Sequence, residues 1–182
     1  MLQPLADQFL DYLTLELGAS EHTRRAYGAD IGALLDQLDR QGVSSLNRVT
    51  REVLLDFLLA ERERGLASAS VSRRLVAIKM FFRYCRREGL LASDVTEVMD
   101  SPRLIRALPD VLTPEEVDRL LNAPDPEKPL GLRDIAILEL FYASGLRVSE
   151  LAGLRLTDLH LDEGYLRCTG KGRKERVVPA GR

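Results

Sequence analysis

Apolar side chains recur every three or four residues over about the first 90 positions of the chain, and polar side chains fill the positions between them. This is the period of an amphipathic α-helix. It is interrupted at Gly18, Gly65 and Gly89, where helices are expected to end, and Ser20 and Thr50 are suitable N-caps. The pattern predicts four helices, at residues 5–17, 20–41, 50–64 and 68–88.

The pattern changes after residue 100. Residues 101–112 follow neither helical nor strand period and contain two prolines, which is typical of a linker. Thr113 then begins a helix as its N-cap, and residues 132–142 form an apolar run expected to be a buried helix. Short alternating stretches predict three strands, at residues 159–161, 165–169 and 175–178. The expected fold is mainly α: a four-helix domain at 1–100, a linker at 101–112, and at 113–182 the start of an α+β domain with a small three-stranded antiparallel sheet.

Composition limits the function classes. A hydrophobic fraction of 45% and a charged fraction of 30% are those of a soluble globular protein, and no apolar run reaches the roughly 20 residues of a membrane span. Cys85 and Cys168 are isolated and form no metal-ligand spacing with His22 or His160. We therefore expect a cytoplasmic protein that holds no metal and no cofactor and has no membrane partner.

Charge is segregated along the predicted helix at 68–88. Val71, Leu75, Ile78, Phe82 and Cys85 share its apolar face. The opposite side carries Ser72, Arg73, Lys79, Arg83 and Arg87, while Arg74 and Arg86 flank the apolar stripe. A soluble helix usually mixes both signs on its outer face. A column of bases with a single acid, Glu88, at its end therefore indicates a polyanionic partner, although the total net charge is −2. The alternative is a solvated outer face.

A second candidate site follows the apolar run at 132–142. Gly145 can end that helix, and Arg147 begins a short second one, which places a planar and permanently charged guanidinium at a corner where it could bind a phosphate. Downstream, Lys171 lies between two glycines at the tip of the expected hairpin. Taken alone, Arg147 could be an ordinary surface arginine and Lys171 a turn residue that favours solubility.

The two stretches together, GLRVSEL at 145–151 and GKGRKERVVP at 170–179, resemble the catalytic domain of tyrosine recombinases, the phage integrase family, and within it the bacterial XerC/XerD type. The resemblance implies that Arg147 and Lys171 are catalytic and that Glu150 supports the arginine. It also implies that the four-helix part is a SAM-like core-binding domain. The DNA contacts expected from the charge pattern and the resemblance are Thr23, Arg24, Tyr27, Ser72, Arg73, Arg74, Lys79, Arg83, Arg87, Arg173, Lys174 and Arg176.

The chemistry implied by the resemblance is site-specific recombination without a metal, through a 3′-phosphotyrosyl intermediate. The implied partners are a duplex DNA recombination site and further recombinase protomers, which form a tetramer on two sites. Chromosome segregation at cell division and integration of mobile elements both remain possible occasions.

The nucleophilic tyrosine and a later His-x-x-Arg pair are not found after Arg176, and Tyr142 and Tyr165 are expected in the core. We therefore expect a catalytically incomplete chain, about the first three fifths of such an enzyme, which binds DNA and does not cut it. Two alternatives remain open. One is a stand-alone DNA-binding or inhibitory protein; the other is a helical module whose basic helix binds an acidic protein.

Overall fold

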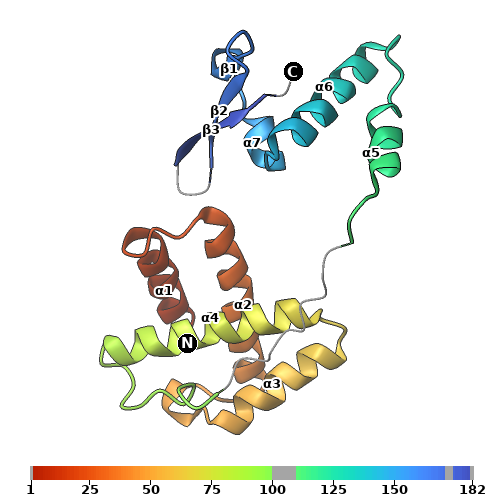
Figure 1. The fold of residues 1–182 in the computed structure, drawn as a ribbon. Helices are drawn as coiled ribbons and strands as arrows, with labels where there is room; N and C mark the ends of the chain where they lie inside the picture. Colours follow the sequence, from red (N-terminus) through yellow and green to blue (C-terminus); the bar gives the residue numbers. More distant parts are fainter. Residues whose placement is uncertain (1, 100–109, 171–173, 181–182) are drawn as a thin grey trace. The chain divides into compact units, whose positions relative to one another are not determined.

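The computed structural model describes residues 2–99, 110–170 and 174–180, and the chain divides into two compact units, Met1–Ala107 and Leu108–Arg182 (Figure 1). Most of the expected linker at 101–112 lies outside the described residues, as do Lys171 and Arg173. In the described part of the chain, no helix is both long enough and apolar enough to cross a bilayer.

The first unit contains the four predicted helices. They are α1 (Gln3–Leu15), α2 (Glu21–Arg40), α3 (Arg51–Glu63) and α4 (Ser68–Arg87). The Ser20 side chain accepts a hydrogen bond from the backbone of Thr23, and Thr50 accepts one from Val53, so both predicted N-caps are confirmed. A single 3₁₀ turn at Leu46–Arg48, which we did not predict, connects α2 to α3.

Helix α4 is the centre of this unit, because it contacts each of the other three helices. Half of its twenty residues are buried. Phe81 is fully buried, with its ring centroid 5.4 Å from that of Phe9 on α1 and 5.9 Å from that of Phe82. Such edge-to-face aromatic contacts add to the free energy gained by burying apolar surface. The core therefore fixes which side of α4 can face solvent.

The second unit has three helices and one sheet. Its elements are α5 (Pro114–Leu121), α6 (Pro129–Ser144), α7 (Val148–Ala152), a 3₁₀ turn (Leu156–Asp158), β1 (Leu159–His160), β2 (Tyr165–Thr169) and β3 (Glu175–Pro179). The strands pair antiparallel in the order β1-β2-β3, with Leu166 opposite Val178. This confirms the predicted mainly α fold with a small three-stranded antiparallel sheet. Thr113 forms a capping box with Glu116 at the start of α5.

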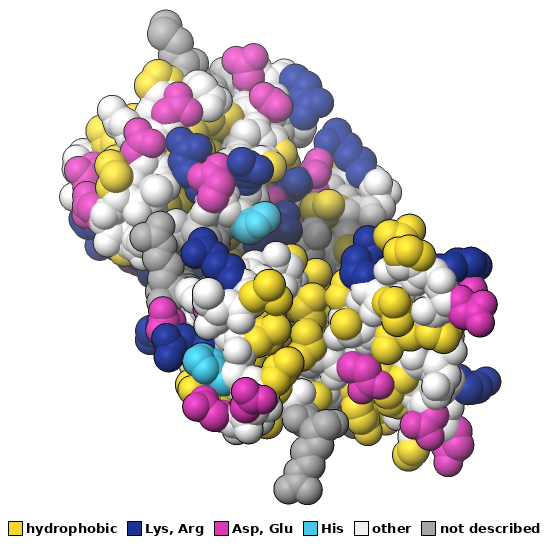
Figure 2. All heavy atoms as spheres, turned by 90° about the horizontal axis from the view of Figure 1, so that it is seen from above, with side chains coloured by type: hydrophobic (Ala, Val, Ile, Leu, Met, Phe, Trp, Pro, Cys, Tyr) yellow, Lys and Arg dark blue, Asp and Glu magenta, His cyan; other side chains and the backbone are white. Residues whose placement is uncertain are grey.

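The prediction that α6 is a buried helix was wrong. Gly131 is its one buried residue in this structure, while Leu130 is 64%, Leu132 59% and Tyr142 67% exposed. Apolar residues lie all around this helix, whereas the described residues of the unit cover only part of it. Hydrophobic side chains (yellow) accordingly appear at the surface in Figure 2. Tyr142 is thus not a core residue; Tyr165 is half-buried and stacks on His160 at 4.5 Å.

Candidate phosphate-binding corner and nucleic-acid interface

The corner between α6 and α7 is held by backbone geometry and one carboxylate. Gly145 ends α6 in the left-handed conformation, with φ of +59°, which glycine adopts without strain. Arg147 is the N-cap of α7, and Glu150 accepts hydrogen bonds from its backbone nitrogen (2.7 Å) and from its Nη1 (2.9 Å). The Arg147 side chain remains 67% exposed. Its guanidinium is therefore anchored at one nitrogen and open to solvent at the others.

Arg176 on β3 completes this cluster. It donates from Nη1 to Oε1 of Glu150 (2.5 Å) and from Nη2 to Oε2 (2.9 Å), in the forked geometry typical of arginine and carboxylate. The Glu150 side chain is only 2% exposed. The hydrogen bonds from Arg176, followed by those from Arg147, lower the pKa of Glu150 from 4.5 to about 2. The same contact raises the pKa of Arg176. Glu150 therefore stays ionised between two cations.

We predicted Arg176 as a DNA-backbone contact; in the structure two of its nitrogens bind Glu150, while 37% of its side-chain surface stays exposed. Its place on the strand explains why. Arg176 is opposite Cys168 in the sheet, and Cys168 is buried, so both side chains lie on the inward face. Side chains alternate along β3, and Val178, two residues after Arg176, packs against the core. This alternation in the sequence could have revealed that Arg176 lies on the inward face.

Gly170 brings the end of β2 against the same cluster. A Cβ atom at this position would lie 3.1 Å from Oε1 of Glu150 and 3.2 Å from Nη1 of Arg176. The Gly170 backbone nitrogen also donates to the carbonyl oxygen of Lys174 at 2.7 Å, and Lys174 is exposed. The two arms of the hairpin are thus fixed to the Arg147 corner, whereas the predicted residues Lys171 and Arg173 lie outside the described residues.

The exposed side of α4 is less uniformly positive than its sequence suggests. Arg86 pairs with Glu97, and Arg87 pairs with Glu88 at 2.9 Å while lying 4.0 Å from the ring centre of Tyr12. Arg73 is bound by Asp30 on α2. Among the described residues, Lys79 and Arg83 are the two bases of α4 with no carboxylate within 4.0 Å. Within the described part of the chain, these two are the unpaired cations of this face.

Two predicted contacts on α4 are corrected. Ser72 is 9% and Arg74 8% exposed, so neither side chain is on the solvent side of the helix. Arg74 donates to Asp30 at 3.2 Å and also pairs with Glu61 on α3. Periodicity alone placed Arg74 at the border of the apolar stripe; it could not reveal partners 44 and 13 residues away in sequence. We leave Ser72 and Arg74 out of the contacts proposed below.

The predicted contacts at the start of α2 lie together. The Thr23 hydroxyl is 2.9 Å from that of Ser20, Arg24 forms an ion pair with Asp11 at 3.4 Å, and Tyr27 is half-buried against the core. The spacing of three and four residues puts Thr23, Arg24 and Tyr27 on one side of the first turns of α2. Arg24 keeps 37% of its side-chain surface exposed.

Comparison with known proteins assigns both units. Residues 6–89 match the model described as "Phage integrase, N-terminal SAM-like domain", and residues 110–182 match the model described as "Phage integrase family". Tyrosine recombinase XerD of Pseudomonas aeruginosa is 45% identical over 178 residues, which cover 98% of this chain and 59% of the relative. Tyrosine recombinase XerC of Xylella fastidiosa is 42% identical over 177 residues, which cover 97% of this chain and 60% of the relative.

The chain thus spans about three fifths of the length of the curated relatives that it matches. In fold it is similar to a lambda integrase tetramer solved on a Holliday junction, with a TM-score of 0.75 at 20% identity over 98% of this chain and 50% of that one. The two domain models match in consecutive order and leave only a short segment between them. On these grounds the chain belongs to the phage integrase family.

Proposed function

We propose that this protein acts in site-specific DNA recombination, by strand cleavage and rejoining through a 3′-phosphotyrosyl intermediate that needs no metal. Residues 1–100 would form the core-binding domain, 101–112 the linker and 113–182 the first part of the catalytic domain. The observation that carries the proposal is the cluster of Arg147, Glu150 and Arg176, in which a buried carboxylate holds an exposed arginine at a helix corner.

This cluster suits a phosphodiester. A reacting phosphate gathers negative charge on its non-bridging oxygens, and fixed cations stabilise that charge best when they need no rearrangement. Glu150 holds Nη1 of Arg147, and the other guanidinium nitrogens have no acceptor among the described residues. We assign Arg147 to those oxygens and Lys171 to the departing 5′ oxygen, because an ammonium can donate a proton and a guanidinium almost never does.

Duplex DNA is the proposed substrate, and further protomers on a second site are the proposed partners. The lambda integrase structure is described as a tetramer bound to a Holliday junction, which supports both. Resemblance to the XerC/XerD type favours chromosome segregation at cell division, in the cytoplasm. The proposed DNA contacts are Thr23, Arg24, Tyr27, Arg73, Lys79, Arg83, Arg87, Arg173, Lys174 and Arg176.

The test measures the affinity of the chain for a labelled duplex oligonucleotide at several salt concentrations. The double variant Lys79→Ala/Arg83→Ala should weaken binding and flatten the dependence of log affinity on log salt by about two units, since each lost phosphate contact removes roughly 0.9. The control, Arg40→Ala/Arg62→Ala, removes the same charge from exposed positions of α2 and α3. Equal slopes for both double variants would rule out α4 as the DNA-binding face.

A further inference from the structure

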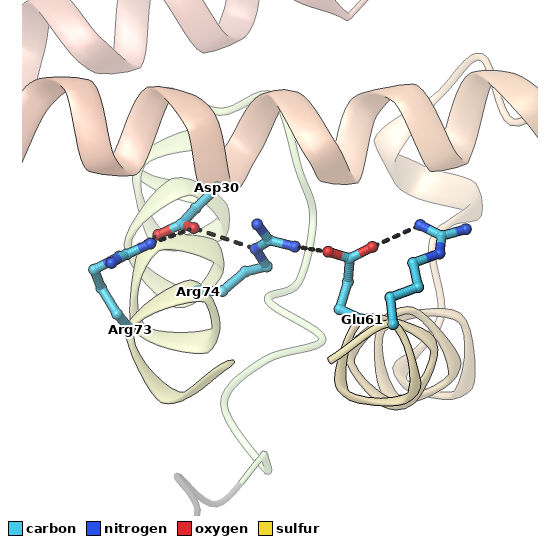
Figure 3. Close-up of polar contacts among 5 residues, drawn as sticks. Asp30, Glu61, Arg73 and Arg74 are labelled. Atoms are coloured by element: carbon cyan, nitrogen blue, oxygen red, sulfur yellow. Dashed lines mark hydrogen bonds and ion pairs between the residues drawn. The ribbon is translucent and has the colours of Figure 1, made fainter. Parts of the chain in front are cut away.

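Charged side chains from α2, from α3 and its C-cap, and from α4 form one network around the buried Asp30, which Figure 3 shows in close-up. Asp30 on α2 has no exposed side-chain surface and accepts three hydrogen bonds from α4. Two come from Arg73, through Nε (2.9 Å) and Nη2 (3.1 Å), and the third from Nε of Arg74 (3.2 Å). Arg74 also pairs with Glu61 on α3, which accepts from Arg64 at 2.7 Å. Every acid in the network thus lies between two arginines.

The network carries an excess of positive charge. Three guanidinium groups face two carboxylates, which leaves one positive charge uncompensated. Arg74 is 9% exposed in its side chain, whereas Arg73 is 44% exposed. Arg74 thus supplies an internal counter-charge for Asp30, and Arg73 can bind Asp30 and still present a net positive charge at the surface.

The geometry of Arg73 leaves one edge of its guanidinium available. Nε and Nη2 are used on Asp30, and among the described contacts Nη1 has no acceptor. Arg73 lies on the same exposed side of α4 as Lys79 and Arg83, within about a third of a turn around the helix axis. A guanidinium bound along one edge has lost its rotational freedom, so a second acceptor can bind the other edge at a smaller entropic cost.

Stability is not the only role that such an arrangement can serve. Taking charges out of water costs free energy that the ion pairs only partly return, and apolar side chains of similar volume often stabilise a core equally well. A buried carboxylate that orients a half-exposed arginine has a second possible role, the positioning of a charge. The pKa of Arg73 is raised chiefly by its hydrogen bonds to Asp30, which agrees with a permanently held cation.

We infer that Asp30 is a positioning residue, which holds the Arg73 guanidinium on the outer side of α4 so that its free edge binds a phosphate of the DNA backbone. Arg74 supplies a second positive charge to Asp30, so the Arg73–Asp30 pair keeps a net positive charge. The inference rests on the proposed DNA-binding function and adds a residue to it that does not itself contact the nucleic acid.

In the first test, loss of negative charge and loss of positioning change the DNA affinity in opposite directions. Asp30→Asn removes a negative charge, so simple electrostatics would make DNA binding tighter, whereas loss of positioning makes it weaker. We expect about a tenfold loss of affinity for a labelled duplex, the scale of one charge-assisted hydrogen bond. Asp36→Asn is the matched control, because it removes the same charge from an exposed position on the same helix. It should bind as tightly as the wild type or more tightly.

The second test compares two lysine substitutions on α4. Arg73→Lys keeps the charge but cannot hold both oxygens of Asp30 and a phosphate at once, so its affinity should fall about as far as that of Arg73→Ala. Arg86 is also exposed on α4 and also pairs with an acid, Glu97, but is not among the proposed DNA contacts, so Arg86→Lys should stay within about twofold of the wild type. If Asp30→Asn fails to fold, this comparison still tests whether Asp30 positions Arg73.

Binding is measured at a temperature at which thermal unfolding shows every variant to be folded. If Asp30→Asn binds like Asp36→Asn, or Arg73→Lys like Arg86→Lys, then Asp30 serves stability alone and the inference is overturned. If the wild-type chain itself shows no salt-dependent binding to duplex DNA, the proposed function fails instead. The two failures are therefore distinguishable.

Discussion

Arg176 on β3 reaches across 26 residues of sequence to Glu150 on α7 and binds both oxygens of its carboxylate. The same carboxylate holds Arg147 from the other side. The strand, the short helix and the exposed arginine are therefore joined through one buried acid, and Gly170 lies close enough to form part of the same contact. Substitutions at these residues should therefore have non-additive effects on stability.

Arg176→Ala should destabilise the second unit, because it leaves the carboxylate of Glu150 buried with one partner fewer. Thermal unfolding should show a midpoint lower by several degrees. Lys174→Ala is the control: it removes an equal charge from an exposed position of the same hairpin and should leave the midpoint nearly unchanged. Equal midpoints for the two variants would mean that the pair with Glu150 contributes little.

The free energy of unfolding should depend on pH within a defined acidic range. The pKa of Glu150 is about 2 in the folded protein and about 4.5 when the group is free, so the unfolded chain binds its proton more readily. The contribution of Glu150 is therefore complete above pH 4.5 and is lost as the pH falls toward 2. Chemical denaturation at several pH values should show this loss in the wild type and not in Glu150→Gln. Parallel curves for the two proteins would contradict the assignment.

Gly131→Ala should be among the most damaging small substitutions in the chain. A Cβ atom there would lie 1.8 Å from the carbonyl oxygen of Asp125, so the turn before α6 would have to move. We expect a loss of about 3 kcal/mol in the free energy of unfolding, at the upper end for overpacking. Gly32→Ala, in α2 with open space around it, should instead be neutral or stabilising by up to about 1 kcal/mol. Denaturant titration of both variants checks the contrast.

The proposed catalytic roles of Arg147 and Lys171 can be tested in a longer protein that includes a nucleophilic tyrosine. Arg147→Ala and Lys171→Ala should each slow cleavage by at least ~10²-fold, the scale for removing a group aimed at the transition state. A substrate with sulfur in place of the 5′ bridging oxygen needs no proton donor. It should restore cleavage by Lys171→Ala and leave Arg147→Ala slow. Restoration of both variants, or of neither, would show that the acid is wrongly assigned.

Much of the first unit could be predicted from local signals. Ser20 and Thr50 cap helices as expected, and the apolar stripes of α2 and α4 form the core, because capping and helical period depend only on residues a few positions apart. The strands of the second unit were predicted equally well from their alternation and turns. The corner at Gly145 and Arg147 was also evident, since a glycine stop followed by a new helix is a local feature.

The pairing of charges could not be predicted in the same way. Asp30 and Arg73 are 43 residues apart, and nothing near either residue indicates the other. Arg74 therefore looked like a surface base although it is buried, and the column of bases on α4 looked uniformly available although Lys79 and Arg83 are the two without an acidic partner in the part of the chain that the structure describes. Tertiary ion pairs decide which charges remain free, and local sequence does not encode them.

Helix α4 serves the core with one side and presents its bases on the other, which limits how this protein can evolve. Ten of its twenty residues are buried, and Arg73 is bound to Asp30. A substitution at most positions of α4 would therefore lower either the stability of the fold or the positive charge of the exposed side. Few substitutions in this helix would be neutral. Val76 is exposed and uncharged, so its substitution would cost neither core packing nor positive charge. We expect descendants that adopt new DNA sites to diverge early at Val76 and last around Asp30.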